Sequence, residues 1–303
     1  MKVSRKKHIL ILIAIGLVYF VGVAAIIYPI AGNMYSINSS KSVINSYAEK
    51  VKKLSVDEIE EKLKNAQKYN EDVAKEIYDD GYERSLNFED DLMCYVEIPK
   101  QEIYLPVYYG TSSDVLLKGC GWLERTSLPI GGPSTHASIS GHTGLPNAEM
   151  FSKLDSSAIG DVFYIHVLNK TLVYKVDRIE TVAPNDVKHL LVIEGEDHVT
   201  LITCTPYGIN DKRLLVRGVR VFTDEETTEG SEVLKHENIS DAAARANDSL
   251  QKQIDNSMTV IIVIVVAAVV VFAGACIWLS KVIKSGSVKP RYARKKRSEE
   301  DDG

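Results

Sequence analysis

The chain has 303 residues, of which 45% are apolar and 25% are charged, and its formal net charge is −5. These averages hide two uncharged apolar runs, Ile9–Ala31 and Met258–Leu279, on either side of a polar middle part. The pattern excludes a simple cytosolic globule, which lacks such runs, and a multi-span transporter, which needs more of them.

The first predicted element is a membrane-spanning helix over residues 9–31, after a short basic tail over residues 1–8. A hydrocarbon core needs about 20 apolar residues of helix, and a buried core helix of this length usually keeps a polar face. A cleaved signal peptide is the alternative, but its apolar region has about 7–15 residues and ends at a small-x-small site, which is missing here. We therefore expect a signal-anchor.

Residues 32–90 are expected to form a helical hairpin between the membrane and the next domain, with a weaker helix over 42–54. Ser55 and Glu58 have the spacing of a capping box, in which each side chain bonds the other residue's backbone N–H. Apolar side chains then recur at three- and four-residue steps: Val56, Ile59, Leu63, Ala66, Val73 and Ile77. This stripe predicts an amphipathic helix that packs against another part of the molecule.

From residue 91 to residue 222 the pattern changes to short strands. The predicted strands are Cys94–Ile98, Ile103–Tyr108, Ala137–Ser140, Asp161–Val167, Leu172–Ile179, Val199–Cys204 and Leu214–Val221. Turns rich in Gly, Pro and Asn separate them, and strands at this spacing predict an all-β barrel or sandwich. The sequence has neither a helix–strand alternation nor a glycine-rich phosphate loop.

Residues 223–257 are polar and acidic, which predicts a solvated stalk with some helix over 241–254. A second membrane helix is expected over 258–280, followed by a basic tail over 281–303. Because positive residues stay in the cytoplasm, both termini are expected inside and residues 32–257 outside. Without the 12 basic and four acidic residues of the two tails, the remainder has 24 basic and 37 acidic residues. This charge near −13 argues against nucleic-acid binding.

A cysteine and a histidine lie where two predicted strands end. Cys204 closes an apolar run and precedes a Thr-Pro-Tyr-Gly turn, and His142 follows residues 137–140 between two glycines. A thiolate is a nucleophile, and an imidazolium beside it lowers the thiol pKa and can protonate a leaving amine. Arg213 or Arg217 can hold a developing oxyanion. On this pattern alone, a buried inert cysteine with a surface histidine remains the more frequent arrangement.

The other cysteines and histidines carry less information. Cys94 and Cys120 either pair in an oxidising compartment or are small buried residues, and the second interpretation is favoured. No Cys-x-x-Cys and no paired metal spacing occurs, so a zinc site is not expected. Four histidines lack any motif and are expected to be structural or solvent-facing: His136, His166, His189 and His198.

Five parts of the predicted β domain carry distinctive strings. They are Thr200–Asn210 continuing to Gly218, Ser138–Pro146, Tyr95–Pro99, Gly119–Glu124 and Thr126–Gly132. These strings closely resemble the motifs of the sortase family, in particular its class C, pilus-assembling branch. The resemblance covers residues 91–222, with looser similarity over the helices before it. It implies an eight-stranded sortase-type β-barrel with an N-terminal helical region, flanked by two transmembrane helices.

The resemblance also implies a cysteine transpeptidase of the Gram-positive cell membrane, with two passes and an extracellular catalytic domain. It makes Cys204 the nucleophile, His142 the general acid and base, and Arg213 the catalytic arginine. Supporting or substrate-binding roles are implied for three residues: Thr203, Thr205 and Arg217. The implied reaction cleaves a Leu-Pro-x-Thr-Gly-like (LPXTG) sorting signal between Thr and Gly through a thioacyl enzyme. An isopeptide bond to a lysine of a second pilin follows, without any metal or organic cofactor.

One family feature is incomplete in this sequence. Many class C members carry a lid with an Asp-Pro-aromatic motif that plugs the site, and here residues 76–84 contain no proline. Asp79 or Asp80 with Tyr82 are the candidates for a lid.

Two alternative functions stay open. The first is an enzyme that anchors surface proteins to cell-wall peptidoglycan. The second is a non-catalytic membrane-tethered binding module. The partners expected for the main hypothesis are pilin or surface proteins with an LPXTG-like signal, an acceptor lysine and membrane lipid, but no nucleic acid.

Overall fold

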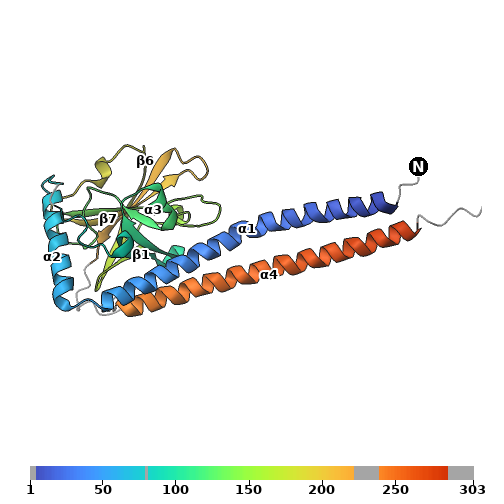
Figure 1. The fold of residues 1–303 in the computed structure, drawn as a ribbon. Coiled ribbons are helices and arrows are strands. Elements are labelled where there is room, and N and C mark those ends of the chain that lie inside the picture. The colour runs from blue at the N-terminus through green and yellow to red at the C-terminus, as the bar shows by residue number, and fades with distance from the viewer. Residues whose placement is uncertain (1–4, 79–80, 222–238, 286–303) are drawn as a thin grey trace, which may run out of the picture. The chain divides into compact units, whose positions relative to one another are not determined.

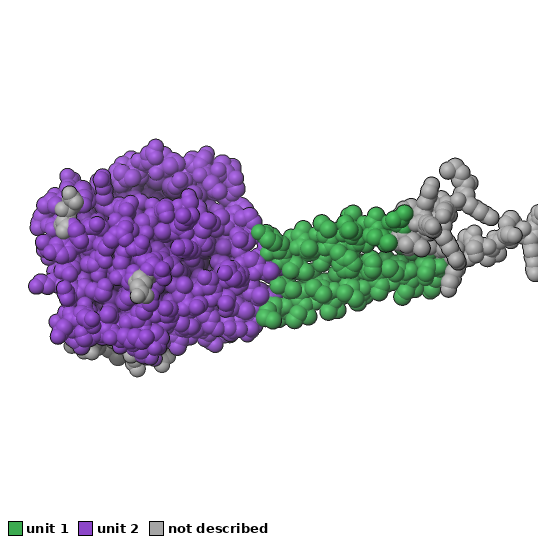
Figure 2. Space-filling view, viewed as in Figure 1, with its two compact units in different colours: residues 1–28, 258–303 green, residues 29–257 purple. Residues whose placement is uncertain are grey.

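The computed structural model describes three ranges of the chain: 5–78, 81–221 and 239–285. Two compact units are present (Figure 2). One consists of Met1–Tyr28 with Met258–Gly303, and the other is Pro29–Ser257.

The smaller unit contains the outer parts of two long helices, α1 (Arg5–Lys52) and α4 (Ile239–Ser285). Both helices are long and apolar enough to cross a membrane. The Tyr19 hydroxyl donates a hydrogen bond to the Ala268 carbonyl oxygen at 3.0 Å, and the Tyr19 ring stacks on Phe272 with 5.9 Å between centroids. The two helices therefore pack side by side within this unit (Figure 1).

The larger unit is built around a closed barrel of eight strands (Figure 1). In chain order they are β1 (Leu92–Ile98), β2 (Ile103–Tyr109), β3 (Cys120–Trp122), β4 (Thr135–Ser140), β5 (Val162–Val167), β6 (Lys170–Val182), β7 (Asp197–Thr205) and β8 (Lys212–Arg220). Their order around the barrel is β1-β2-β3-β4-β7-β8-β6-β5. The pairs β2–β3 and β4–β7 are parallel, and the others are antiparallel. The predicted eight-stranded barrel is confirmed.

Strand β3 is the one strand that the sequence pattern does not predict. It has three residues, and Gly121 lies so close to β2 that a Cβ there would be 2.2 Å from the Gly110 carbonyl oxygen. A strand this short, with a glycine at its centre, shows no alternation of apolar and polar side chains. It pairs with β2 on one side and β4 on the other, and so completes the barrel wall.

The remaining helices are short apart from α2. They are α2 (Val56–Val73), α3 (Ser113–Lys118) and the 3₁₀ turns η1 (Glu89–Asp91), η2 (Pro99–Gln101), η3 (Leu154–Ser156) and η4 (Lys188–Leu190). The capping box of α2 is present: the Ser55 hydroxyl accepts from the Glu58 N–H, and the Glu58 carboxylate accepts from the Ser55 N–H at 2.7 Å. The predicted start of this helix is therefore confirmed.

Helix α2 packs on the main core of the barrel. Ala66, Tyr69 and Val73 are buried there with Trp122, as the apolar stripe predicts for the middle of the helix. The stripe fails at its ends, because Val56 and Ile77 are exposed.

The first part of α4 differs from the predicted solvated stalk. Residues 239–254 contribute Ile239, Ala243 and Leu250 to a second buried cluster, which includes Tyr47 of α1 and Tyr104 of β2. Small alanine side chains let helices approach closely, but they are a weak hydrophobic signal in an acidic segment. Residues 223–238 of the predicted stalk lie outside the described residues.

Candidate active site

The β7–β8 hairpin presents the predicted nucleophile beside the predicted arginine. Cys204 lies directly opposite Arg213 in the antiparallel pair, and both side chains are half-buried. Side chains of directly opposed residues lie on the same face of a sheet. The pairing of β7 with β8 is regular from His198 to Thr205, so Arg217, four residues further along β8, shares that face.

The parallel pairing of β4 with β7 brings the predicted histidine to the same end of the barrel. Ser140 is level with Ile202, and the Gly141 N–H donates to the Ile202 carbonyl oxygen at 2.9 Å. His142 and Cys204 each lie two residues beyond the Ser140–Ile202 pair. Two residues 62 positions apart in the chain therefore follow adjacent strands at the same end of the barrel.

Two further contacts hold the histidine and cysteine segments together. The Thr203 hydroxyl donates to the Gly141 carbonyl oxygen at 2.8 Å, and this bond joins the residue before Cys204 to the residue before His142. The Tyr207 ring also packs on the histidine loop, where a Cβ at Gly144 would be 3.4 Å from Tyr207 Cε2.

The two arginines have different surroundings. Arg213 Nη1 donates to the carbonyl oxygens of Lys212 at 3.0 Å and Asn210 at 3.4 Å, so the guanidinium stays at the hairpin turn. Arg217 forms an ion pair with Asp177 of β6, in which both Nε and Nη2 donate to the carboxylate. Arg213 thus lies opposite Cys204 in the hairpin, while Arg217 is engaged by Asp177, and the catalytic and supporting roles of the two residues stay predictions.

Thr203 and Thr205 lie on the same face of β7, opposite to the face of Cys204. Thr203 is buried, on the same face of β7 as the core residue Leu201, and its hydroxyl is used within the protein. Thr205 is half-buried, is level with Lys212, and alternates with Thr203 around Cys204. Any direct contact of Thr203 with substrate thus stays a prediction, whereas its support of the strand ends is a matter of geometry.

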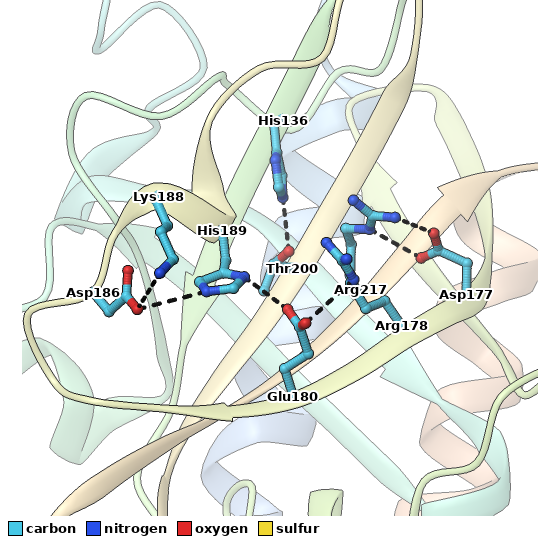
Figure 3. A network of polar contacts seen from close by, with 9 residues as sticks. All are labelled: His136, Asp177, Arg178, Glu180, Asp186, Lys188, His189, Thr200 and Arg217. Carbon is cyan, nitrogen blue, oxygen red and sulfur yellow. Dashed lines mark hydrogen bonds and ion pairs between the residues drawn. The ribbon is translucent and has the colours of Figure 1, made fainter.

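A network of polar contacts lies next to Arg217, where the chain between β6 and β7 crosses the barrel (Figure 3). His189 Nδ1 is 2.8 Å from the Glu180 carboxylate, and its Nε2 is 3.6 Å from Asp186, which also pairs with Lys188 at 3.2 Å. These contacts tie η4 to the end of β6 and to the first part of the β6–β7 connection.

A buried histidine, His136 of β4, contacts the β6–β7 connection and strand β7. His136 Nδ1 is 2.9 Å from the Leu191 carbonyl oxygen, and its Nε2 is 2.7 Å from Thr200 Oγ1. Burial lowers the pKa of His136 to about 4, so its ring is neutral at pH 7. His136 is thus a structural histidine, as expected. Its partners are distant in the sequence, so no local pattern predicts them.

The lid candidates are only partly described. Tyr82 packs against the main core, with Lys68 Nζ of α2 4.5 Å from its ring centroid. Asp79 and Asp80 lie outside the described residues. A lid role for these three residues stays a prediction.

The remaining thiols of the barrel have no catalytic surroundings. Cys94 and Cys120 are fully buried free thiols on either side of β2, as the favoured interpretation expects, and burial raises the pKa of both. Among residues 5–78, 81–221 and 239–285, no group of three His, Cys, Asp or Glu side chains is placed to hold a metal ion.

A cavity of about 710 Å³ lies between α2 and the barrel. Its lining includes Asp197 and Arg220, at the first residue of β7 and the last of β8. Cys204 and Arg213 are at the other ends of these strands, so the cavity is separate from the candidate active site.

The sortase domain family matches residues 96–221, which include all of the catalytic candidates. Sortase A of Staphylococcus aureus is 37% identical over 128 residues, a match that covers 39% of this chain and 60% of that protein. The chain therefore matches less than two thirds of the length of this curated relative.

Solved structures of class C sortases match over almost their whole length. Sortase C of Streptococcus pneumoniae, described with its pilin substrate specificity, is 44% identical with a TM-score of 0.56, and the match covers 60% of this chain and 97% of that one. Sortase C of Clostridium perfringens with the C-terminal cell wall sorting motif is 46% identical with a TM-score of 0.57, and the match covers 60% and 99%. The chain belongs to the sortase family, and its structural neighbours are class C sortases.

Proposed function

We propose that the chain is a membrane-anchored cysteine transpeptidase that joins pilin subunits covalently. Cys204 is the nucleophile, His142 is the general acid and base, and Arg213 stabilises the oxyanion. Thr203, Thr205 and Arg217 support these groups or the bound signal.

The first half-reaction cleaves an LPXTG-like sorting signal. The Cys204 thiolate attacks the threonine carbonyl carbon, and the two guanidinium N–H groups of Arg213 compensate the charge that develops on its oxygen. The C–N bond to glycine then breaks, and the His142 imidazolium protonates the departing amine. The products are a thioacyl enzyme and a fragment that begins with glycine.

The second half-reaction transfers the acyl group. A lysine amine of the next pilin attacks the thioester carbon, neutral His142 accepts the amine proton, and Cys204 leaves as the thiolate. An isopeptide bond has formed, and thiolate and imidazolium are both restored. The cycle consumes no oxidant or reductant.

The observation that carries the proposal is the meeting of three strand ends. The register of β7 with β8 pairs Cys204 with Arg213, and the register of β4 with β7 brings the segment that carries His142 to the same end of the barrel. An inert cysteine in a binding module would need neither partner, which disfavours the non-catalytic alternative.

The pilin acceptor is supported by class C sortases that match over nearly their full length. The class C neighbours are 44% and 46% identical, whereas the curated Sortase A relative is 37% identical over part of its length. That second likeness keeps cell-wall anchoring of surface proteins as the alternative.

The two apolar helices support anchoring at both ends of the catalytic unit. By the positive-inside rule, the basic tails that flank them favour both termini in the cytoplasm and residues 32–257 outside the cell membrane of a Gram-positive bacterium. Membrane lipid is then a partner of both helices, and the substrates are secreted proteins that reach the outer face.

The thioacyl step is tested with the full chain in detergent and an LPXTG peptide. Mass spectrometry is expected to find the acyl adduct on Cys204, and Cys204→Ala should abolish it. Cys276→Ala, the matched control in α4, should leave it intact. A wild-type chain that forms no adduct would sink the proposal in favour of the binding module.

The acceptor is tested separately, with the acylated enzyme and two competing amines. A pilin lysine should yield ladders on a denaturing gel, and the amine of a cell-wall precursor should yield little product. Monomeric wall-linked product alone would replace pilin polymerisation by wall anchoring, without affecting the assignment of Cys204.

A further inference from the structure

The loop that carries His142 is a compact structure held at its base. The Phe151 N–H donates to the His142 carbonyl oxygen at 2.9 Å, and Leu145 and Ala148 form a β-bridge nearer the tip. The Phe151 ring is buried and lies so close to Gly141 that a Cβ there would be 2.7 Å from Phe151 Cδ2. The backbone of His142 is therefore coupled directly to the returning arm of the loop.

The tip of this loop rests on α1, at the first residues of the larger unit. The Glu149 N–H donates to Asn33 Oδ1 at 2.9 Å. Gly32 lies against Asn147, and a Cβ on Gly32 would be 2.5 Å from Asn147 Cβ, 3.1 Å from its Cα and 3.2 Å from its carbonyl oxygen. Contacts under 3.0 Å do not occur between real atoms of this kind, so the close approach requires a glycine.

The path from α1 to His142 is short. From Glu149, whose N–H is held by Asn33, the chain runs through Met150 to Phe151, whose N–H is held by His142. Met150 has a φ of +44°, a backbone conformation that residues other than glycine rarely adopt, and its side chain is buried. The strained backbone at Met150 shows that the surrounding structure holds this arm in one conformation. A shift at the contact with α1 should therefore be transmitted along the arm to His142.

We propose that Gly32 and Asn33 of α1 are positioning residues, which hold the loop so that the His142 imidazole is aligned for proton transfer at Cys204. This inference rests on the proposed role of His142. Residues 32 and 33 follow directly on the apolar run, so the same helix that anchors the enzyme also sets the geometry of its general acid. Neither residue touches substrate or Cys204 in this assignment.

Gly32→Ala is the decisive variant because it separates positioning from stability. Alanine is more favourable than glycine in a helix interior, so the helix itself should not be destabilised. The added methyl group must displace Asn147, and we expect kcat for thioacylation to fall about 10-fold, since small misplacements of a catalytic group are costly. KM should change little, and the basic limb of the pH–rate profile, where the general acid loses its proton, should shift.

The chain offers a matched control and a rescue. Gly22→Ala, on the same helix, adds a methyl group with nothing within 4 Å, and kcat should equal that of the wild type. Gly32→Ala combined with Asn147→Gly removes the colliding Cβ and should recover most of the lost rate. For the hydrogen bond, Asn33→Asp keeps an acceptor for the Glu149 N–H and should be nearly silent, whereas Asn33→Leu should lower kcat a few-fold.

Hydrogen exchange of the full chain gives a readout independent of chemistry. In Gly32→Ala and Asn33→Leu, peptides covering residues 141–152 should exchange faster, and those of β7 and β8 should not. A Gly32→Ala enzyme with the kcat, pH profile and loop exchange of Gly22→Ala would overturn the inference while leaving the proposed function standing. A wild-type chain without any Cys204 adduct would overturn the proposed function, and altered loop exchange would still show that α1 holds the loop.

Discussion

Thr203 shows how one side chain serves two segments that are far apart in sequence. Its hydroxyl is buried on the inner face of β7 and bonds the Gly141 carbonyl oxygen, while the next residue, Cys204, projects from the outer face. Because successive side chains of a strand alternate between faces, the nucleophile can reach solvent only if its neighbour points into the core. The polar neighbour is tolerated there because its hydrogen bond is made inside the protein.

Thr203→Val should therefore destabilise the protein and slow catalysis. Valine has the same shape but leaves the Gly141 carbonyl oxygen unpaired in a buried site, which costs about 1–3 kcal/mol. Thermal unfolding of the full chain should show a lower Tm, and the thioacylation rate should fall as the His142 end of β4 loosens. Thr181→Val on β6, at an exposed position, is the control. An unchanged Tm for Thr203→Val would contradict the account.

Substitutions of Arg213 and Arg217 on β8 should affect different properties of the protein. Arg213→Lys loses the two-pronged donor set beside Cys204, and kcat is expected to fall about 10²-fold or more. Arg217→Lys keeps a charge for Asp177 but loses one hydrogen bond, at a cost of about 1 kcal/mol in the free energy of unfolding. Steady-state kinetics and urea unfolding of both variants check this division, and a larger kcat loss in Arg217→Lys would reverse the two roles.

At the scale of elements, the first part of α4 is bound to the barrel through a buried carboxylate. Glu97 of β1 is 1% exposed, accepts from His166 Nε2 of β5 at 2.8 Å, and pairs with Arg245 of α4 at 2.9 Å. Tyr104 of β2 also donates to Ser249 of α4 at 3.1 Å. The helix that follows the barrel is thus part of the packed unit, not a tether to it.

Arg245→Ala should loosen this attachment. The substitution removes a charged hydrogen-bond donor from a buried carboxylate, which costs about 1.5–3 kcal/mol. Urea unfolding of the full chain measures the loss, and hydrogen exchange should accelerate over residues 239–254. Lys252→Ala, exposed on the same helix, should leave both unchanged. Equal stabilities of the two variants would show that Arg245 contributes nothing to docking.

The same carboxylate predicts a pH dependence. Burial by itself raises the pKa of Glu97, but hydrogen bonds from His166 and Arg245 and their charges outweigh burial and hold it below the ordinary value of 4.5. A group with a lowered folded-state pKa contributes stability that is complete above its unfolded pKa and is lost as the pH falls through the folded value. Between pH 5 and 3 the wild type should therefore lose more stability than Glu97→Gln. Parallel curves for the two proteins would rule this origin out.

At the scale of the whole molecule, the charge distribution predicts the compartments. With the basic tails on the cytoplasmic face and the acidic middle part outside, as we propose, the average of −5 describes neither part. In a chain carrying Cys204→Ala and Cys276→Ala, cells with Lys118→Cys should be labelled by a membrane-impermeant maleimide, and cells with Ser298→Cys only after lysis. Labelling of Ser298→Cys in intact cells would place the C-terminus outside.

The sequence by itself determined the features that depend on local periodicity and on neighbouring residues. These are the two apolar helices, the capped start of α2 and seven of the eight strands, and each follows from residues close together in the chain. The motif strings assigned Cys204, His142 and Arg213 to one site by resemblance to a family. No local rule connects residues 62 positions apart, and the pattern alone does not choose between Arg213 and Arg217.

Only the tertiary structure decided the contacts that close over long stretches of chain. The parallel pairing of β4 with β7, the insertion of β3, and the docking of α4 on Glu97 each depend on segments that carry no pattern for one another. The packing of Gly32 and Asn33 against the His142 loop also depends on segments far apart in the chain. A glycine in an apolar helix does not indicate which residue it will contact. The physical reason is that packing and buried hydrogen bonds decide which surfaces of the chain pair with one another. Periodicity in the sequence indicates only which face of an element is buried, not what covers that face.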